Sequence, residues 1–196
     1  MRLVFAFLLA GGLSSGLDLR YWIEPCTRPE TRCLAQDPQL AQWALEDWQR
    51  SSEGKLHLEK TTDIRRANIR VHWASQNEGL YGEARPFIED GIRGAEVYVL
   101  PDLSGMGRDI SSATRVDALL RDAIVYLTCL HETGHALGLA HTDAFPDIMY
   151  TFTAGGDIPE YFGRFRRRLM ARADIAKTSA ISPQDHTRLM TVIERY

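Results

Sequence analysis

The segment from His131 to His141 constrains this chain more than any other part of its sequence. It reads His-Glu-Thr-Gly-His-Ala-Leu-Gly-Leu-Ala-His, with three histidines, a glutamate and a glycine at informative spacings. Residues four apart lie on one face of a helix, so the imidazoles of His131 and His135 project together and can share one metal ion. Gly138 can adopt the positive φ that ends a helix, and the resulting turn allows His141 to return as a third ligand.

The residue types in this segment match the chemistry of catalytic zinc. Three imidazoles leave a fourth position open to water, whereas structural zinc sites are usually closed by four protein ligands. Zinc lowers the pKa of its bound water to about 7, and a neighbouring carboxylate can accept the remaining proton as that water attacks a carbonyl. The sequence therefore predicts one catalytic Zn²⁺ held by His131, His135 and His141, with Glu132 as the general base.

The whole stretch resembles the HExxHxxGxxH motif of the metzincin zinc metallopeptidases, which is completed by a methionine turn beneath the metal. Met149, within Asp147-Ile148-Met149-Tyr150, follows His141 by eight residues, and this spacing is most similar to the matrixin branch. The resemblance implies that Met149 forms an apolar floor under the zinc without binding it. It also implies an α/β (α+β) catalytic domain with a twisted mixed sheet, a long active-site helix, the methionine turn and a C-terminal helix.

Three features depart from the usual matrixin pattern. The sequence has no cysteine switch of the PRCG type, and only about 20 residues precede its first predicted helix after the N-terminal apolar segment. The histidine and aspartate cluster of a second, structural zinc is missing, since no histidine occurs between Trp73 and Leu130. Thr151 follows Tyr150 where matrixins usually have proline. We therefore expect a different wall for the pocket that accepts the residue after the scissile bond.

Hydrophobic periodicity predicts the elements before the motif. Asp37 as N-cap and Pro38 in the first turn begin a helix that is closed by Gly54. Alternating apolar and polar side chains predict strands over residues 55–60, 68–73 and 95–100. Residues 79–85 are compatible with an edge strand or a loop, and they are the candidate strand for pairing with an extended substrate.

A long helix is predicted over residues 115–137, with Thr114 and Asp117 as its capping arrangement and Val116 at the start of its apolar stripe. The first two histidines of the motif lie at its C-terminal end. An irregular region follows, and Ser182 as cap with Pro183 at the first helical position begins a C-terminal helix.

The first 16 residues are predicted to be a signal peptide, because Met1 and Arg2 precede an apolar run over residues 3–10 and then small residues. The alternative is a buried N-terminal strand. The run is far shorter than the roughly 20 residues that cross a bilayer, and no later segment approaches that length. We expect a secreted or periplasmic protein without an integral membrane segment, in which residues 17–196 form a single catalytic domain.

The cysteines fit an oxidising compartment. Cys26 and Cys33 are close in sequence and are expected to close a small disulfide loop. In the alternative interpretation, Cys26 caps the zinc within a short pro-segment. Cys129 is expected to be a buried free thiol.

Charge and motif together predict the partners and the activity. A net charge of -3 gives no basic surface for nucleic acid, and the arginines between residues 164 and 172 are expected to form a solvated helix face. The predicted protein is a monomeric zinc endopeptidase acting on peptide or protein substrates. Alternatives are a narrow-specificity peptidase and a non-catalytic, zinc-stabilised binding protein. No feature of the sequence indicates a site for Ca²⁺.

Overall fold

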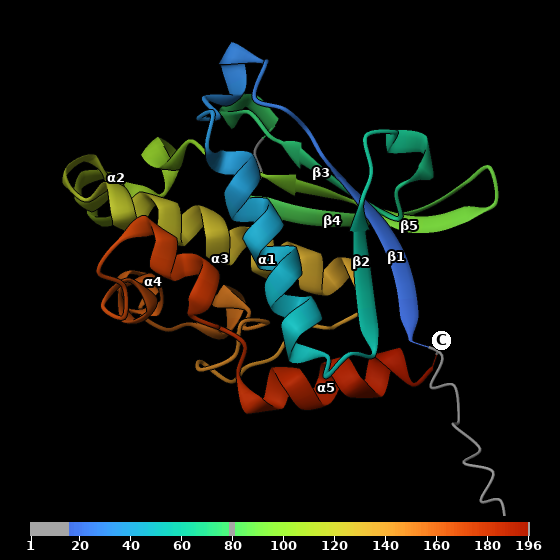
Figure 1. The fold of residues 1–196 in the computed structure, drawn as a ribbon. Coiled ribbons are helices and arrows are strands. Elements are labelled where there is room, and N and C mark those ends of the chain that lie inside the picture. The colour runs from blue at the N-terminus through green and yellow to red at the C-terminus, as the bar shows by residue number, and fades with distance from the viewer. Residues whose placement is uncertain (1–15, 79–80, 196) are drawn as a thin grey trace, which may run out of the picture.

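The computed structural model describes residues 16–78 and 81–195 (Figure 1). One mixed sheet has the strand order β2-β1-β3-β5-β4, with β4 antiparallel to β5 and the other neighbouring strands parallel. Its strands are β1 (Leu17–Ile23), β2 (Leu56–Lys60), β3 (Ile69–Trp73), β4 (Gly82–Glu89) and β5 (Ile92–Val99). The helices are α1 (Asp37–Ser51), α2 (Gly107–Val116), α3 (Ala118–Ala136), α4 (Ile158–Arg166) and α5 (Pro183–Ile193). The α/β class and mixed sheet expected from the sequence are confirmed.

The core lies between one face of the sheet and the helices α1 and α3, which pack side by side on it (Figure 1). Trp48 of α1 is fully buried there, and its indole N–H donates to the carbonyl of Leu130 in α3 at 2.9 Å. Ile69 and Val71 of β3 and Val97 of β5 meet the helices from the sheet side. Each such buried side chain contributes about 1.5–3 kcal/mol, so this layer fixes α3 against the sheet.

The predicted long helix is interrupted, which corrects the sequence-based boundary at residue 115. Asp117 is extended, with φ -123° and ψ 91°, and separates α2 from α3. Its carboxylate accepts the N–H of Leu120 at 2.9 Å, so Asp117 is the N-cap of α3 rather than a partner of Thr114. Val116 is 88% exposed and does not belong to the apolar stripe. Aspartate favours a cap over a helix interior because its side chain bonds nearby backbone N–H groups.

Other boundaries also differ from the prediction. Asp37 is the first residue of α1, not its N-cap, and its buried carboxylate pairs with Arg121 of α3. β1 is absent from the sequence-based prediction, although Leu17–Ile23 alternates inward and outward side chains. β4 begins at Gly82 within the predicted segment 79–85, and β5 starts before the predicted strand 95–100. The two strands form a hairpin that turns at Asp90 and Gly91.

The helix α4 occupies the region that was predicted to be irregular. Asp157 accepts the N–H of Glu160 at 2.9 Å and caps it. The arginines of this region are not a uniformly solvated face, because Arg166 pairs with Asp117 at 2.9 Å and Arg172 pairs with Asp122 at 2.8 Å. These ion pairs connect α4 and the following turn to α3.

No helix in the described ranges combines the length and the apolarity that crossing a membrane would require. Residues 1–15 of the proposed signal peptide lie outside the described residues, and Gly16 directly precedes β1.

Candidate metal centre

The three motif histidines converge on one point. His131 and His135 project from the last two turns of α3, and His141 returns from the loop that follows. The Nε2 atom of His141 lies 3.1 Å from Nε2 of His131 and 3.0 Å from Nε2 of His135. Zinc–nitrogen bonds of about 2.0–2.1 Å would set tetrahedral ligand nitrogens about 3.3 Å apart. The spacing of the three nitrogens therefore fits a single zinc ion.

The hydrogen bonds of the Nδ1 atoms identify the tautomers of His131 and His135. Nδ1 of His131 lies 2.7 Å from the carbonyl oxygen of Ile148, and Nδ1 of His135 lies 2.8 Å from that of Leu139. Because a carbonyl only accepts hydrogen bonds, we assign the proton to Nδ1 in both rings. Each Nε2 then directs a lone pair at the shared point. Carbonyls that accept a hydrogen bond from Nδ1 impose this orientation on metal-binding histidines.

Burial keeps these imidazoles neutral. Desolvation lowers the pKa of His131 to about 4, opposed by its bond to Ile148, and desolvation likewise lowers the pKa of His135. Neutral imidazole is the form that binds metal. The three-histidine donor set fits zinc, as do the tautomers and the charge states of His131 and His135.

A helix-ending turn brings the third histidine back. Gly138 has φ +100°, its N–H donates to the carbonyl of His135 at 2.9 Å, and the N–H of Leu139 donates to that of Gly134 at 3.0 Å. These two bonds form a Schellman motif, which requires a left-handed residue at the position of Gly138. The predicted helix-terminating turn is therefore present, and it leads directly to His141.

Met149 is fully buried and packs against Gly134, within the turn of α3 that carries His131 and His135. A Cβ atom placed on Gly134 would lie 2.5 Å from Sδ of Met149 and 2.9 Å from Cζ2 of Trp48. Gly134 was not among the predicted site residues, although a glycine inside the helical motif is an available signal of close packing. Absence of a side chain at Gly134 allows the methionine turn to approach α3.

The methionine turn is also bound to α5. The Asp147 carboxylate accepts hydrogen bonds from Ser182 at 2.6 Å and Thr142 at 3.0 Å, and it pairs with Arg188. Asp185 accepts the N–H of Ile148 at 2.7 Å. Burial alone would raise the pKa of Asp147, but the bonds from Ser182, Arg188 and Thr142 outweigh it and lower that pKa. No sequence pattern predicts this hydrogen-bond network, because the methionine turn and α5 lie far apart in the chain.

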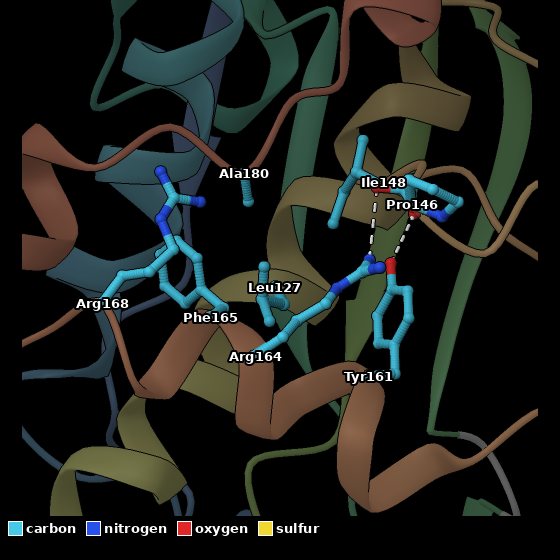
Figure 2. Close-up of a pocket in the computed structure, with 8 residues that line it drawn as sticks. All are labelled: Leu127, Pro146, Ile148, Tyr161, Arg164, Phe165, Arg168 and Ala180. Atoms are coloured by element: carbon cyan, nitrogen blue, oxygen red, sulfur yellow. Dashed lines mark hydrogen bonds between the residues drawn. The ribbon is translucent and has the colours of Figure 1, made fainter.

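Helix α4 packs against the methionine turn, and a cavity of about 260 Å³ lies between the helix and the turn (Figure 2). The Tyr161 hydroxyl donates to the carbonyls of Asp147 at 3.1 Å and Ile148 at 3.2 Å. Arg164 donates to the carbonyls of Phe145 at 2.7 Å and Pro146 at 3.3 Å. Tyr161 and Leu127 separate this cavity from the cleft over the histidines.

Glu132 lies in that cleft, a cavity of about 430 Å³ that also contacts His131 and His141. Its side chain is buried, and burial together with the negative charge of Glu83 raises its pKa to about 8. A cation held by the histidines would act in the opposite direction. Gly82 of β4 passes so close that a Cβ there would overlap Oε1 of Glu132. The apolar wall of the cleft comprises Leu127, Tyr150, Phe152, Ile158, Tyr161 and Phe162.

The cysteines lie apart from the histidines. Cys26 and Cys33 form a disulfide with their Cα atoms 5.3 Å apart, which occupies the sulfur that the alternative interpretation assigned to zinc. Cys129 is free and fully buried, and burial raises the pKa of its thiol. The cluster of His131, His135 and His141 contains neither a cysteine nor a fourth protein ligand within the described residues.

A comparison with protein families agrees with the motif. A family model described as matrixin matches residues 16–160. Among solved structures, the chain is similar to archaemetzincin (amzA) from Methanopyrus kandleri, with 14% identity and a TM-score of 0.43, over 96% of this chain and 100% of that chain. No curated protein matches it.

Gly134→Ala tests the packing beneath the metal centre. Alanine normally stabilises a helix interior by about 1 kcal/mol relative to glycine. At this position the added methyl group meets Met149 and Trp48, so we expect a loss of about 1–3 kcal/mol in the free energy of unfolding, together with weaker zinc binding. Urea denaturation of the metal-free protein and a zinc titration measure the two effects.

Gly163→Ala in α4 is the matched control, because the nearest atom to its new methyl group is the mobile end of Arg167. We expect this variant to be as stable as the parent or more stable. Equal behaviour of the two variants would contradict close packing at Gly134.

Asp147→Asn tests the bond between the methionine turn and α5. A carboxylate whose pKa is lowered by folding adds stability above its unfolded pKa of about 3.9, and this stability disappears as pH falls through the folded pKa. We expect the variant to lose about 2 kcal/mol at pH 7 and to show a weaker pH dependence of stability between about pH 5 and pH 2. Urea denaturation of chelator-treated protein measures both, with the exposed Asp143→Asn as control. A pH dependence identical to the parent would contradict the proposed role of Asp147.

Proposed function

The chain belongs to the matrixin family of zinc-dependent peptidases, and from that premise we propose that it is a secreted endopeptidase with Glu132 as its general base. His131, His135 and His141 would hold the single zinc ion. The observation that carries this proposal is the convergence of three histidines beside a carboxylate in an open cleft, with the metal-binding tautomer fixed in His131 and His135 by backbone carbonyls. Retention of Glu132 disfavours the non-catalytic alternative.

The residues around the zinc position have separate tasks in this proposal. A bound zinc ion would supply Lewis acidity, which lowers the pKa of water and polarises a carbonyl group. The Glu132 carboxylate accepts a proton from the attacking water and returns it to the leaving amine. Hydrogen bonds from Nδ1 of His131 and His135 to backbone carbonyls hold the two imidazoles in place throughout the reaction.

The free edge of β4 supports an extended peptide as the substrate. The N–H of Leu100 donates to the carbonyl of Tyr81, so every second residue from Tyr81 onward bonds to β5. The main-chain groups of Gly82, Ala84 and Pro86 therefore face outward at the edge of the sheet. A peptide that adds antiparallel to this edge passes directly over Glu132.

The cleft supports selection of the residue that follows the scissile bond. Its wall is aromatic and aliphatic, and Tyr161 closes its inner end. We propose that a large apolar side chain enters here. Thr151, which stands where matrixins usually have proline, lies on this wall. Whether cleavage is broad or narrow depends on how many substrate positions are selected in addition to this one.

Glu132→Ala and His135→Ala separate catalysis from metal binding. The Glu132 variant keeps all three ligands, so we expect it to bind about one zinc per chain while peptide hydrolysis falls by about 10²–10⁴-fold. The His135 variant loses a ligand, so zinc affinity and activity should fall together. His57→Ala, on the exposed side of β2, is the control and should change neither quantity.

The readouts are elemental analysis for zinc and mass-spectrometric mapping of cleavage sites in an unfolded protein, with and without a chelator. Near-parental cleavage by a pure Glu132→Ala protein would exclude this glutamate as the base.

Secretion is tested by the mass of exported protein. If residues 1–16 are a signal peptide, the secreted or periplasmic product should lack that segment. Its intact mass should also be two hydrogen atoms lighter than the reduced form, because Cys26 and Cys33 are paired. Retention of the complete N-terminus in exported protein would exclude the signal peptide. The predicted monomeric state is read in the same sample by sedimentation.

A further inference from the structure

A second groove begins on the other side of the histidines from the apolar cleft. It is a cavity of about 660 Å³ that contacts His135, Ala136 and Gly138. Because α3 ends at Ala136, the helix does not cover the inner face of the sheet beyond this point. The groove uses that uncovered face. Its sheet side contains the polar residue Asn68 and several apolar ones, among them Leu17, Leu19, Ile69, Ala84, Pro86 and Ala95. The surface beside His135 is therefore apolar.

The far end of the groove is cationic. A neighbouring cavity of about 410 Å³ shares Arg93 and Gly138 with the groove and adds Val192 and Arg195. Arg93 lies opposite Ile88 in the hairpin, which places its side chain on the same inner face as Ala84 and Pro86. Within residues 16–78 and 81–195, neither Arg93 nor Arg195 has a carboxylate at ion-pair distance. Two exposed arginines thus border one hollow, and neither has an ion-pair partner in the described part of the chain.

The direction of β4 decides which part of a substrate reaches this groove. β4 runs from Gly82, which lies against Glu132, towards Pro86, which lines the groove. A peptide paired antiparallel to β4 runs the other way, so its segment before the scissile bond lies over the groove. Pro86 has no N–H, and a peptide residue opposite it finds an acceptor but no donor. Beyond Ala84, side-chain contacts must therefore contribute most of the recognition.

We propose that this groove selects substrates by the segment that precedes the scissile bond, with a bulky apolar residue near the cleaved bond and an acidic residue further towards the N-terminus. The proposal rests on the proposed peptidase function and adds a substrate class to it. The apolar side chain packs against Ala84 and Pro86 of β4, and the carboxylate binds the guanidinium groups of Arg93 and Arg195.

The test uses fluorogenic peptides that differ only before the scissile bond. The outer position carries Glu, Gln or Lys, and the inner position carries Leu or Ala. For the zinc-loaded protein we expect kcat/KM to be on the order of tenfold higher with Glu than with Gln, mainly through KM, and similarly higher with Leu than with Ala. Arg93→Glu and Arg195→Glu should remove the preference for Glu or transfer it to Lys.

Arg115→Glu is the matched control, because Arg115 is an exposed arginine in α2 that lines none of these cavities. It should keep the parental preference. Thermal unfolding of each variant identifies loss of folding, and Arg93→Lys, which keeps the charge, should retain a reduced preference for Glu. An unchanged Glu-to-Gln ratio in folded Arg93→Glu and Arg195→Glu proteins would overturn the proposal.

A binding measurement separates this proposal from the peptidase function itself. Fluorescence anisotropy of the same peptides on the zinc-loaded Glu132→Ala protein should show the same order of affinities, Glu above Gln above Lys. Ordered binding without any cleavage by the parent would contradict the peptidase function and leave the groove assignment standing. Cleavage or binding without that order would overturn the groove assignment alone. A dimer that dissociates in Arg93→Glu would also overturn it, since a second copy would then occupy the groove.

Discussion

The backbone of Ile148 is the point on which the metal centre depends. Its carbonyl accepts hydrogen bonds from Nδ1 of His131 at 2.7 Å and from the Tyr161 hydroxyl at 3.2 Å, while its N–H donates to Asp185 at 2.7 Å. One backbone unit therefore joins α3, α4 and α5. Since Ile148 precedes Met149, the same residue positions the methionine turn against Gly134 and fixes the tautomer of one ligand. Loss of its bond to Tyr161 or to Asp185 would change the orientation of His131.

The surrounding burial gives the site its chemical character. Desolvation keeps His131 and His135 neutral, and the carbonyls bound to their Nδ1 atoms direct the Nε2 lone pairs at a common point, a geometry that a cation stabilises. Gly82, which lacks a side chain, leaves space for Glu132 directly below the free edge of β4. The centre and the substrate edge are thus held by one rigid arrangement of α3 and the sheet, which is the support that a precise catalytic geometry needs.

The sequence predicted features that depend on neighbouring residues and missed those that depend on contacts between distant segments. The histidine spacing, the turn at Gly138 and the cap at Ser182 are local, because each depends on residues within one or two helical turns, and the structure contains all three. The break at Asp117 was missed because a cap and a helix interior compete for the same residue, and Arg166, far along the chain, favours the cap. The contacts of Gly134 with Trp48 and of Asp147 with Arg188 join distant segments, so no spacing in the sequence reveals them.

Zinc K-edge X-ray absorption of the reconstituted protein tests the central claim most directly. With one zinc per chain held by His131, His135 and His141, the spectrum should show three imidazole nitrogens and one further light atom at about 2.0–2.1 Å, and no sulfur. The His135→Ala protein should lose one imidazole contribution. Sulfur scattering at about 2.3 Å, or a spectrum unchanged in His135→Ala, would contradict the three-histidine centre.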